Sequence, residues 1–246
     1  MFRRWIALRS ARPHGPTMST IAILPVKSFG AAKQRLAPAL GAGSRQALAQ
    51  AMFSDVLSSL RRVPGLDAVA VVTADRVAES AALGERVEVL RDTELAGQSV
   101  AALIGVRHAQ AHGFDRVLLV PGDTPLLDSG EVAALLRRAL DGGIGAVVVP
   151  DRHGEGTNAL LLTPPEAIEP AFGPGSCKRH VAAARDAGVP CAVESVPTLA
   201  LDVDTSEDLE LLAATLESRR GYAPATRGAL RQLQRSRASR RPPVPA

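Results

Sequence analysis

The chain has 246 residues, of which 46% are hydrophobic; this suffices for a sizeable buried core and excludes a wholly disordered protein. No apolar run approaches the roughly 18 to 20 uncharged residues that cross a bilayer, so we expect a soluble protein without membrane contact. The formal net charge is +4 at neutral pH. The two cysteines, Cys177 and Cys191, form neither a disulfide framework nor a zinc spacing, which fits a reducing, cytoplasmic location.

The excess positive charge belongs to the two ends of the chain. Residues 1–17 and 219–246 hold 12 of the 29 Lys and Arg residues and no Asp or Glu. Residues 18–218 carry the other 17 basic residues and all 25 acidic ones, a net charge of −8. We therefore predict a disordered basic extension over 1–17, one folded domain over 18–218 and a disordered Arg/Pro-rich tail over 219–246. An acidic body also argues against nucleic acid as a partner.

Short apolar runs alternate with segments of helical period along the body. The predicted strands are Ile21–Val26, Ala68–Thr73, Val87–Arg91, Arg116–Val120, Gly145–Pro150, Ala159–Thr163, Cys191–Ser195 and Leu199–Val203. The predicted helices are Ser44–Arg61, Arg76–Leu83, Ser99–Ala111, Ser129–Leu140, Ser176–Ala187 and Ser206–Ser218, with Ser129 and Ser206 as N-caps. Repeated strand–helix pairs with continuous apolar strands predict a mainly parallel α/β sheet covered on both faces. Ligands of such sheets bind beyond the carboxyl ends of the strands.

The loop after the first predicted strand is rich in cations. Lys27, Lys33 and Arg35 follow the buried run within ten residues, an arrangement that suits the phosphates of a nucleotide. The loop has neither the Gly-Lys-Ser/Thr of a Walker A loop nor the glycines of the dinucleotide-binding fingerprint. An ordinary solvated loop remains the alternative.

Three aspartates follow buried strands in the sequence. Asp123 comes directly after the fourth strand, and Asp202 and Asp204 flank Val203 in an extended segment, so that both point to one side. Like charges held close together are unfavourable unless a cation or a basic group lies between them. The three carboxylates could supply the hard oxygen ligands that Mg²⁺ prefers, with phosphate oxygens completing its shell. The alternative is that Asp204 caps the following helix and that Asp123 caps a turn.

Two glycine-bearing turns follow later strands. The first leads into Thr157, and the second carries Gly173 ahead of Ser176, which could cap a helix. Backbone amides at that helix start, the serine hydroxyl and the nearby Lys178 and Arg179 would form a small anion site. A simple Gly-Pro turn with an N-cap serine explains the local sequence equally well.

These segments together resemble the guanylyltransferases of coenzyme F-420 biosynthesis, which act on 2-phospho-L-lactate or, in actinobacterial relatives, on phosphoenolpyruvate. The resemblance covers about residues 18–215 and rests on motifs that occur in family order. They are Pro25-Val26-Lys27, Ala32-Lys33-Gln34-Arg35-Leu36, Gly122-Asp123-Thr124-Pro125, Asp151-Arg152-His153-Gly154-Glu155-Gly156-Thr157-Asn158, Phe172-Gly173-Pro174-Gly175-Ser176 and Asp202-Val203-Asp204-Thr205.

The resemblance implies a single-domain nucleotidyltransferase fold of the glycosyltransferase-A type. It implies a reaction in which the phosphate of a three-carbon phospho-acid attacks the α-phosphate of GTP and expels pyrophosphate. It also assigns the phospho-acid site to Thr157, Gly173 and Ser176, and the Mg²⁺ site to Asp123, Asp202 and Asp204. The Ala, Arg and Gly bias of the chain has an actinobacterial look, which favours phosphoenolpyruvate over 2-phospho-L-lactate.

No general base is expected, because a phosphate oxygen is already nucleophilic at neutral pH and no convincing base stands in the sequence. Other readings are a sugar-phosphate or molybdopterin-type nucleotidyltransferase, which would have a glycine-rich first loop, and a non-catalytic nucleotide- or nucleic-acid-binding protein. Retention of all three aspartates argues against the non-catalytic nucleotide binder. The sequence leaves the oligomeric state open, a homodimer included.

Overall fold

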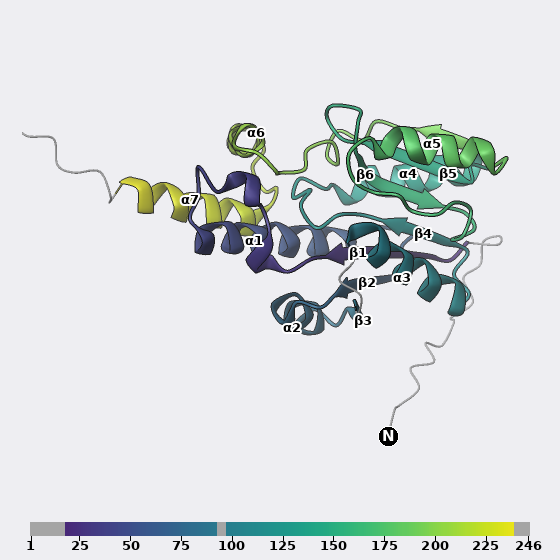
Figure 1. Ribbon diagram of the computed structural model, residues 1–246, viewed down its shortest axis with the longest axis horizontal. Coiled ribbons are helices and arrows are strands. Elements are labelled where there is room, and N and C mark those ends of the chain that lie inside the picture. The colour runs from purple at the N-terminus through teal and green to yellow at the C-terminus, as the bar shows by residue number, and fades with distance from the viewer. Residues whose placement is uncertain (1–17, 93–96, 239–246) are drawn as a thin grey trace, which may run out of the picture.

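The computed structural model describes residues 18–92 and 97–238 (Figure 1). The predicted extension over 1–17 therefore lies outside the described residues. No helix in the described part of the chain has both the length and the apolar character needed to span a membrane.

Within the described residues seven strands form one sheet, in the order β3-β2-β1-β4-β6-β5-β7. Only β6 runs antiparallel to its neighbours, β4 and β5, whereas the other adjacent pairs are parallel. This confirms the predicted mainly parallel α/β sheet. The strands are β1 (Thr20–Val26), β2 (Ala68–Thr73), β3 (Glu88–Arg91), β4 (Arg116–Leu119), β5 (Ala146–Pro150), β6 (Thr157–Leu162) and β7 (Cys191–Val193).

Helices cover both faces of this sheet. They are α1 (Ala42–Leu60), α2 (Arg76–Gly84), α3 (Gln98–Ala111), α4 (Ser129–Asp141), α5 (Ser176–Asp186), α6 (Ser206–Ser218) and α7 (Pro224–Ala238), with short 3-10 turns η1 (Phe29–Ala31) and η2 (Gln34–Leu36) after β1. The N-caps of α4 and α6 are Asp128 and Thr205, one residue before the predicted serines. Each cap side chain accepts hydrogen bonds from amides of the first turn, and Asp208 completes a capping box with Thr205.

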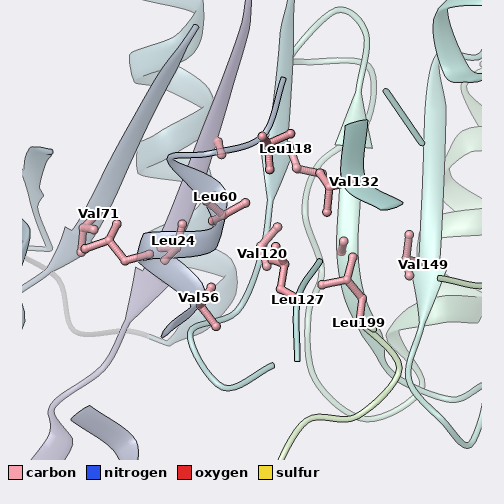
Figure 2. Close-up of a cluster of buried hydrophobic side chains, with 14 of the residues drawn as sticks. Leu24, Val56, Leu60, Val71, Leu118, Val120, Leu127, Val132, Val149 and Leu199 are labelled. Carbon is pink, nitrogen blue, oxygen red and sulfur yellow. The ribbon is translucent and has the colours of Figure 1, made fainter. Parts of the chain in front are cut away.

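The strands are apolar throughout because both of their faces are buried. Leu24 joins a core under α1, α2 and α4, whereas its neighbour Ile23 joins a second core under α3 and α5. Figure 2 shows the first core, in which strand side chains meet Val56 and Leu60 of α1. On the other face, α3 approaches β1 closely at Gly105, where a Cβ atom would lie 2.4 Å from a methyl of Ile23.

The prediction of a disordered tail over 219–246 is wrong for residues 219–238, which include α7. Leu230 and Leu233 lie on one side of this helix and pack on a third core formed with α1 and α6. The buried carboxylate of Asp55 on α1 accepts hydrogen bonds from the amides of Ala225 and Thr226 at 3.1 and 2.7 Å, which anchors the start of α7. In Figure 1 α7 runs alongside α1. The prediction failed because it followed the high Arg content of this segment and not the apolar side of the helix.

The predicted strand over Leu199–Val203 is also absent. Its first residues form a turn, and the rest is extended without a ladder. Leu199 nevertheless lies in the core, and the alternation expected here holds, with Val203 buried and Asp202 and Asp204 partly exposed. The segment is held by other contacts, among them a hydrogen bond from the Val203 amide to the Asp123 carbonyl at 3.3 Å.

Candidate active site

A cavity of about 440 Å³ opens beyond the carboxyl ends of β1 and β4. These two strands are neighbours in the sheet, although β2 and β3 come between them in the chain, so the cavity lies at the switch point where such sheets bind ligands. Its lining residues are Pro25, Val26, Lys27, Phe29, Ala31, Ala32, Lys33, Gln34, Arg35, Ala49, Met52, Phe53, Gln98, Ala101, Pro121, Gly122, Asp123 and Asp204.

The loop after β1 places the predicted cations around this cavity. Lys27 and Arg35 line it and are exposed, as a phosphate-binding role requires. The loop is fixed by Phe29, which packs on Phe53 with 5.7 Å between ring centroids. Its backbone amide also donates to the Asp75 carboxylate at 2.9 Å. The sequence analysis did not single out Asp75, whose carboxylate also caps α2.

Lys33 plays a different part from Lys27 and Arg35. Its side chain is only 7% exposed, and its Nζ donates to Asp123 Oδ2 at 2.5 Å and to Asp204 Oδ1 at 2.9 Å. Burial alone would lower the pKa of the Lys33 ammonium, but the charges of the two carboxylates raise it well above its ordinary value. Lys33, which the sequence predicted to bind phosphate, thus pairs with the carboxylates of the predicted metal site.

Asp202 belongs to the same cluster. Its Oδ1 accepts a hydrogen bond from the side-chain amide of Asn158 at 3.1 Å, and that amide also binds the carbonyls of Leu199 and Ala200. Burial, followed by the charge of Asp123, raises the pKa of the Asp202 carboxyl above its ordinary value. Lys33 is paired with two carboxylates, Asp123 and Asp204, which together carry more negative charge than one ammonium neutralises.

The arrangement contradicts both capping alternatives. The N-cap of α6 is Thr205 rather than Asp204, and Asp123 binds Lys33 instead of a turn. The Asp123 Oδ1 atom is buried and has no hydrogen-bond partner within the described residues. A buried carboxylate oxygen without a donor is costly unless a cation or ligand donor faces it.

We tested whether these residues fit Mg²⁺. The described residues contain no group of three or more His, Cys, Asp or Glu side chains arranged to hold an ion by themselves. Mg²⁺ is usually bound through one or two carboxylates, with waters and substrate phosphates completing its shell, so a complete cage is not required. The unpartnered Asp123 oxygen and the excess negative charge fit a cation that arrives together with phosphate.

The turn before β6 is organised by Asp151. Its carboxylate accepts hydrogen bonds from the amides of His153, Glu155 and Gly156 at 2.8 to 3.0 Å. Gly156 is required there, because a Cβ atom would lie 2.6 Å from Asp151 Oδ2. Consecutive residues of β6 then serve two clusters, since Asn158 binds Asp202 and Thr157 faces the start of α5.

Thr157, Gly173 and Ser176 meet at the start of α5. The Ser176 and Thr157 hydroxyl oxygens lie 3.1 Å apart, and Thr157 Oγ1 lies 3.0 Å from Nδ1 of the fully buried His180. Gly173 has φ of +110°, a conformation that favours glycine, and it turns the loop into the helix. The structure therefore brings the three predicted residues together and adds His180, which lies one helical turn beyond Ser176.

At the start of α5, several groups that the sequence predicted as donors to an anion bind the protein itself instead. The Ser176 and Cys177 amides donate to the carbonyls of Gly173 and Glu155. The Arg179 guanidinium donates to carbonyls of the loop, at 2.9 Å to Ala171 and 2.5 Å to Pro174. These groups hold the loop together, and Ser176 is the first helical residue rather than its cap.

Sequence reasoning missed Asn158, His180 and Asp151 as parts of the site. Asn158 and Asp151 lie in the segment 151–158 that carries part of the family resemblance, but no local feature shows what their side chains bind. The i, i+4 spacing of Ser176 and His180 was the available signal for the histidine, since such residues share a helix face.

A basic loop and a carboxylate cluster at the switch point of an α/β sheet define a protein of the nucleotidyltransferase class. The fold agrees: the structure of a nucleotidyl transferase from Methanothermobacter thermautotrophicus superposes with a TM-score of 0.55 at 20% identity, covering 83% of this chain and all of that one. The chain belongs to the family described as guanylyl transferase CofC like, which matches residues 20–233.

Two relatives of known name differ in their acid substrate. A phosphoenolpyruvate guanylyltransferase from Conexibacter woesei is 51% identical over 89% of this chain and 98% of its own length. A 2-phospho-L-lactate guanylyltransferase from Methanothermobacter thermautotrophicus is 36% identical over 78% of this chain and 83% of its own length.

Proposed function

We propose that this protein transfers the guanylyl group of GTP to phosphoenolpyruvate in coenzyme F-420 biosynthesis, forming enolpyruvoyl-2-diphospho-5'-guanosine and pyrophosphate. The observation that supports the proposal best is that two consecutive residues of β6 connect the two predicted sites. Thr157 contacts the Ser176 hydroxyl group at the predicted phospho-acid site, and Asn158 binds Asp202 of the carboxylate cluster beside the cavity. The 51% identity to the Conexibacter phosphoenolpyruvate guanylyltransferase supports GTP and this acid.

In the proposed reaction a phosphate oxygen of phosphoenolpyruvate attacks the α-phosphorus of GTP. The new phosphorus–oxygen bond forms while the bond from the α-phosphorus to the β-phosphate bridging oxygen breaks, and pyrophosphate carries the electron pair away. The nucleophile is already anionic, so no side chain needs to remove a proton. Positioning and charge neutralisation therefore supply most of the rate.

The side chains have separate tasks in this scheme. Lys27 and Arg35 neutralise phosphates of the nucleotide in the cavity, and Thr157 with Ser176 orients the phosphate of the acid. Asp123, Asp202 and Asp204 would hold Mg²⁺, which lowers the repulsion between the two substrates and stabilises the departing charge. Lys33 holds two of these carboxylates in place.

The test is a panel of reactions with purified protein. Each of GTP, ATP, CTP and UTP is incubated with phosphoenolpyruvate or 2-phospho-L-lactate, and pyrophosphate release is measured with and without Mg²⁺. We expect Mg²⁺-dependent release with GTP and phosphoenolpyruvate. Release without any acid, or no release with any pair, would contradict guanylyl transfer.

The second candidate substrate is 2-phospho-L-lactate, the acid named for the Methanothermobacter relative. The two acids share a phosphate and a carboxylate and differ at C3, a small apolar difference worth only about 1 to 3 kcal/mol in a pocket. Equal concentrations of the two acids competing for limiting GTP should give mainly the enolpyruvoyl product. A majority of the lactyl product would overturn the choice of acid and leave guanylyl transfer standing.

A further inference from the structure

His180 is buried completely beneath the proposed phospho-acid site, and both of its ring nitrogens have partners. Nε2 lies 2.8 Å from the backbone amide nitrogen of Ala171, and Nδ1 lies 3.0 Å from Thr157 Oγ1. The ring also packs edge-on against Phe172, with 5.3 Å between centroids.

These contacts fix which ring nitrogen carries the proton. A backbone N–H can only donate, so Nε2 must accept from Ala171 and cannot be protonated. Burial and the nearby charge of Arg179 lower the pKa of His180 to about 4, so the ring is neutral at pH 7. A neutral ring has one N–H, which is therefore on Nδ1 and donates to Thr157 Oγ1.

The protons of the two hydroxyl groups can then be counted. Thr157 Oγ1 accepts from His180, and a single proton lies between Thr157 Oγ1 and Ser176 Oγ. Two hydroxyl groups own two protons, so one proton is left without an acceptor among the described residues. This spare donor is buried, since Thr157 is 6% exposed and Ser176 1% exposed. A buried donor without an acceptor indicates a ligand that supplies one.

The other tautomer would remove that donor. A bare Nδ1 would accept the Thr157 proton, and Ser176 would donate to Thr157, so both hydroxyl protons would be used within the protein. Nε2–H would then face the N–H of Ala171, which places two donors against each other.

We propose that His180 is a positioning residue whose Nδ1–H tautomer, set by the Ala171 amide, leaves the Thr157–Ser176 pair with one hydroxyl proton to donate to a phosphate oxygen of the acid substrate. The inference rests on the proposed function for the identity of that ligand.

The same contacts tie the donor to the shape of the loop. Ala171 precedes Phe172 and Gly173, and Arg179 binds the carbonyls of all three residues. The loop must be in place for its amide to select the tautomer. The loop conformation that places Gly173 is thus the same one that leaves the hydroxyl proton available to a ligand.

The first test reads the tautomer in the wild-type protein without turnover. Ring ¹⁵N NMR of protein labelled on histidine, with the His180 signals assigned from their loss in His180→Phe, should show a neutral ring protonated on Nδ1 at pH 7. Titration with inorganic phosphate should perturb these signals but not change the tautomer. A ring that is charged, or protonated on Nε2, would overturn the proposal.

The second test is a double-mutant cycle with Thr157→Val. His180→Phe keeps an aromatic ring beside Phe172 but removes the Nδ1–H that orients the Thr157 hydroxyl group. KM for phosphoenolpyruvate should therefore rise roughly fivefold, the loss expected for one neutral hydrogen bond, with KM for GTP unchanged. In the Thr157→Val background the same change should alter KM by less than about twofold, because His180 then has no hydroxyl group to orient. His112→Phe, at an exposed histidine at the end of α3, is the matched control and should match wild type.

The outcomes separate the two proposals. Equal losses from His180→Phe in both backgrounds, or equal increases in KM for both substrates, would mean that His180 is only structural. Wild-type protein that releases no pyrophosphate with any acid would contradict the proposed function instead, and the NMR experiment would still decide the tautomer.

Discussion

Lys33 shows how a single cation can organise a site made of like charges. Its ammonium lies between Asp123 and Asp204, while Asp202 accepts a hydrogen bond from the neutral side-chain amide of Asn158. The cluster therefore pairs one ammonium with two carboxylates and keeps an excess of negative charge. We infer that Lys33 keeps the carboxylates close enough for a divalent cation to join when the nucleotide brings its phosphates.

We expect Asp204→Asn to reduce turnover at least about 100-fold, because it removes a charge from the proposed Mg²⁺ site with little change of shape. The measurement is steady-state pyrophosphate release over a range of Mg²⁺ concentrations. Asp186→Asn is the control, since that carboxylate is exposed and pairs with Arg185. Near-normal activity of a folded Asp204→Asn protein would remove Asp204 from the metal site.

The buried ring of His180 makes stability depend on pH. In the unfolded chain this histidine takes up a proton near its ordinary pKa of 6.5, whereas in the folded protein the pKa is about 4. Between these values the unfolded state binds more protons, so the free energy of unfolding falls as the pH falls. From pH 7.5 to pH 5 the contribution of His180 is about 2 kcal/mol.

Urea unfolding of wild type and His180→Phe at both pH values measures this contribution. The wild-type protein should lose about 2 kcal/mol more than the variant on acidification, because the phenylalanine cannot be protonated. Equal losses in the two proteins would show that His180 has its ordinary pKa in the folded state.

At the scale of elements, α7 is part of the folded unit. It covers apolar side chains of α1 and α6, and Met52 of α1 belongs both to that core and to the cavity lining. Residues 219–238 are therefore not a separable tail. The helix supports the wall of the cavity through α1.

A chain ending at residue 218 should lose roughly 3 kcal/mol or more in urea unfolding, because Leu48, Met52, Leu212 and Leu216 become exposed. Its KM for GTP should also rise. A chain ending at residue 238 keeps α7 and serves as the control. Unchanged stability of the shorter chain would mean that α7 contributes little to the fold.

Sequence reasoning was reliable where one local signal decides the structure. Short continuous apolar runs such as Ile21–Val26 favour strands buried on both faces, and most of those predicted here are strands, so the sheet was predictable. Residues 219–238 were predicted as disordered because of their Arg and Pro content. The two leucines on one side of α7 stabilise the helix only by packing on α1 and α6, which are distant in the sequence. Long-range contacts, such as Lys33 with Asp204 or His180 with Thr157, have no local signature and needed the fold.

For the whole molecule, the switch point between β1 and β4 explains why residues from distant parts of the chain meet. The loop after β1 brings the cations, the loop after β4 brings Asp123, and the extended segment before α6 returns Asp202 and Asp204 to the same edge. The positive charge of the chain is concentrated at its ends, so under the proposed function the attraction for anionic substrates would come from a few cations placed around the cavity, such as Lys27 and Arg35.

The central claim is that the phosphate of the acid is the nucleophile in guanylyl transfer. Phosphoenolpyruvate labelled with ¹⁸O in its three terminal phosphate oxygens, incubated with GTP, Mg²⁺ and the protein, tests it by mass spectrometry of both products. All of the label should appear in the guanylylated acid and none in pyrophosphate, because an acid oxygen becomes the bridge of the new diphosphate. Label in pyrophosphate or orthophosphate, or formation of GDP in place of pyrophosphate, would contradict the account.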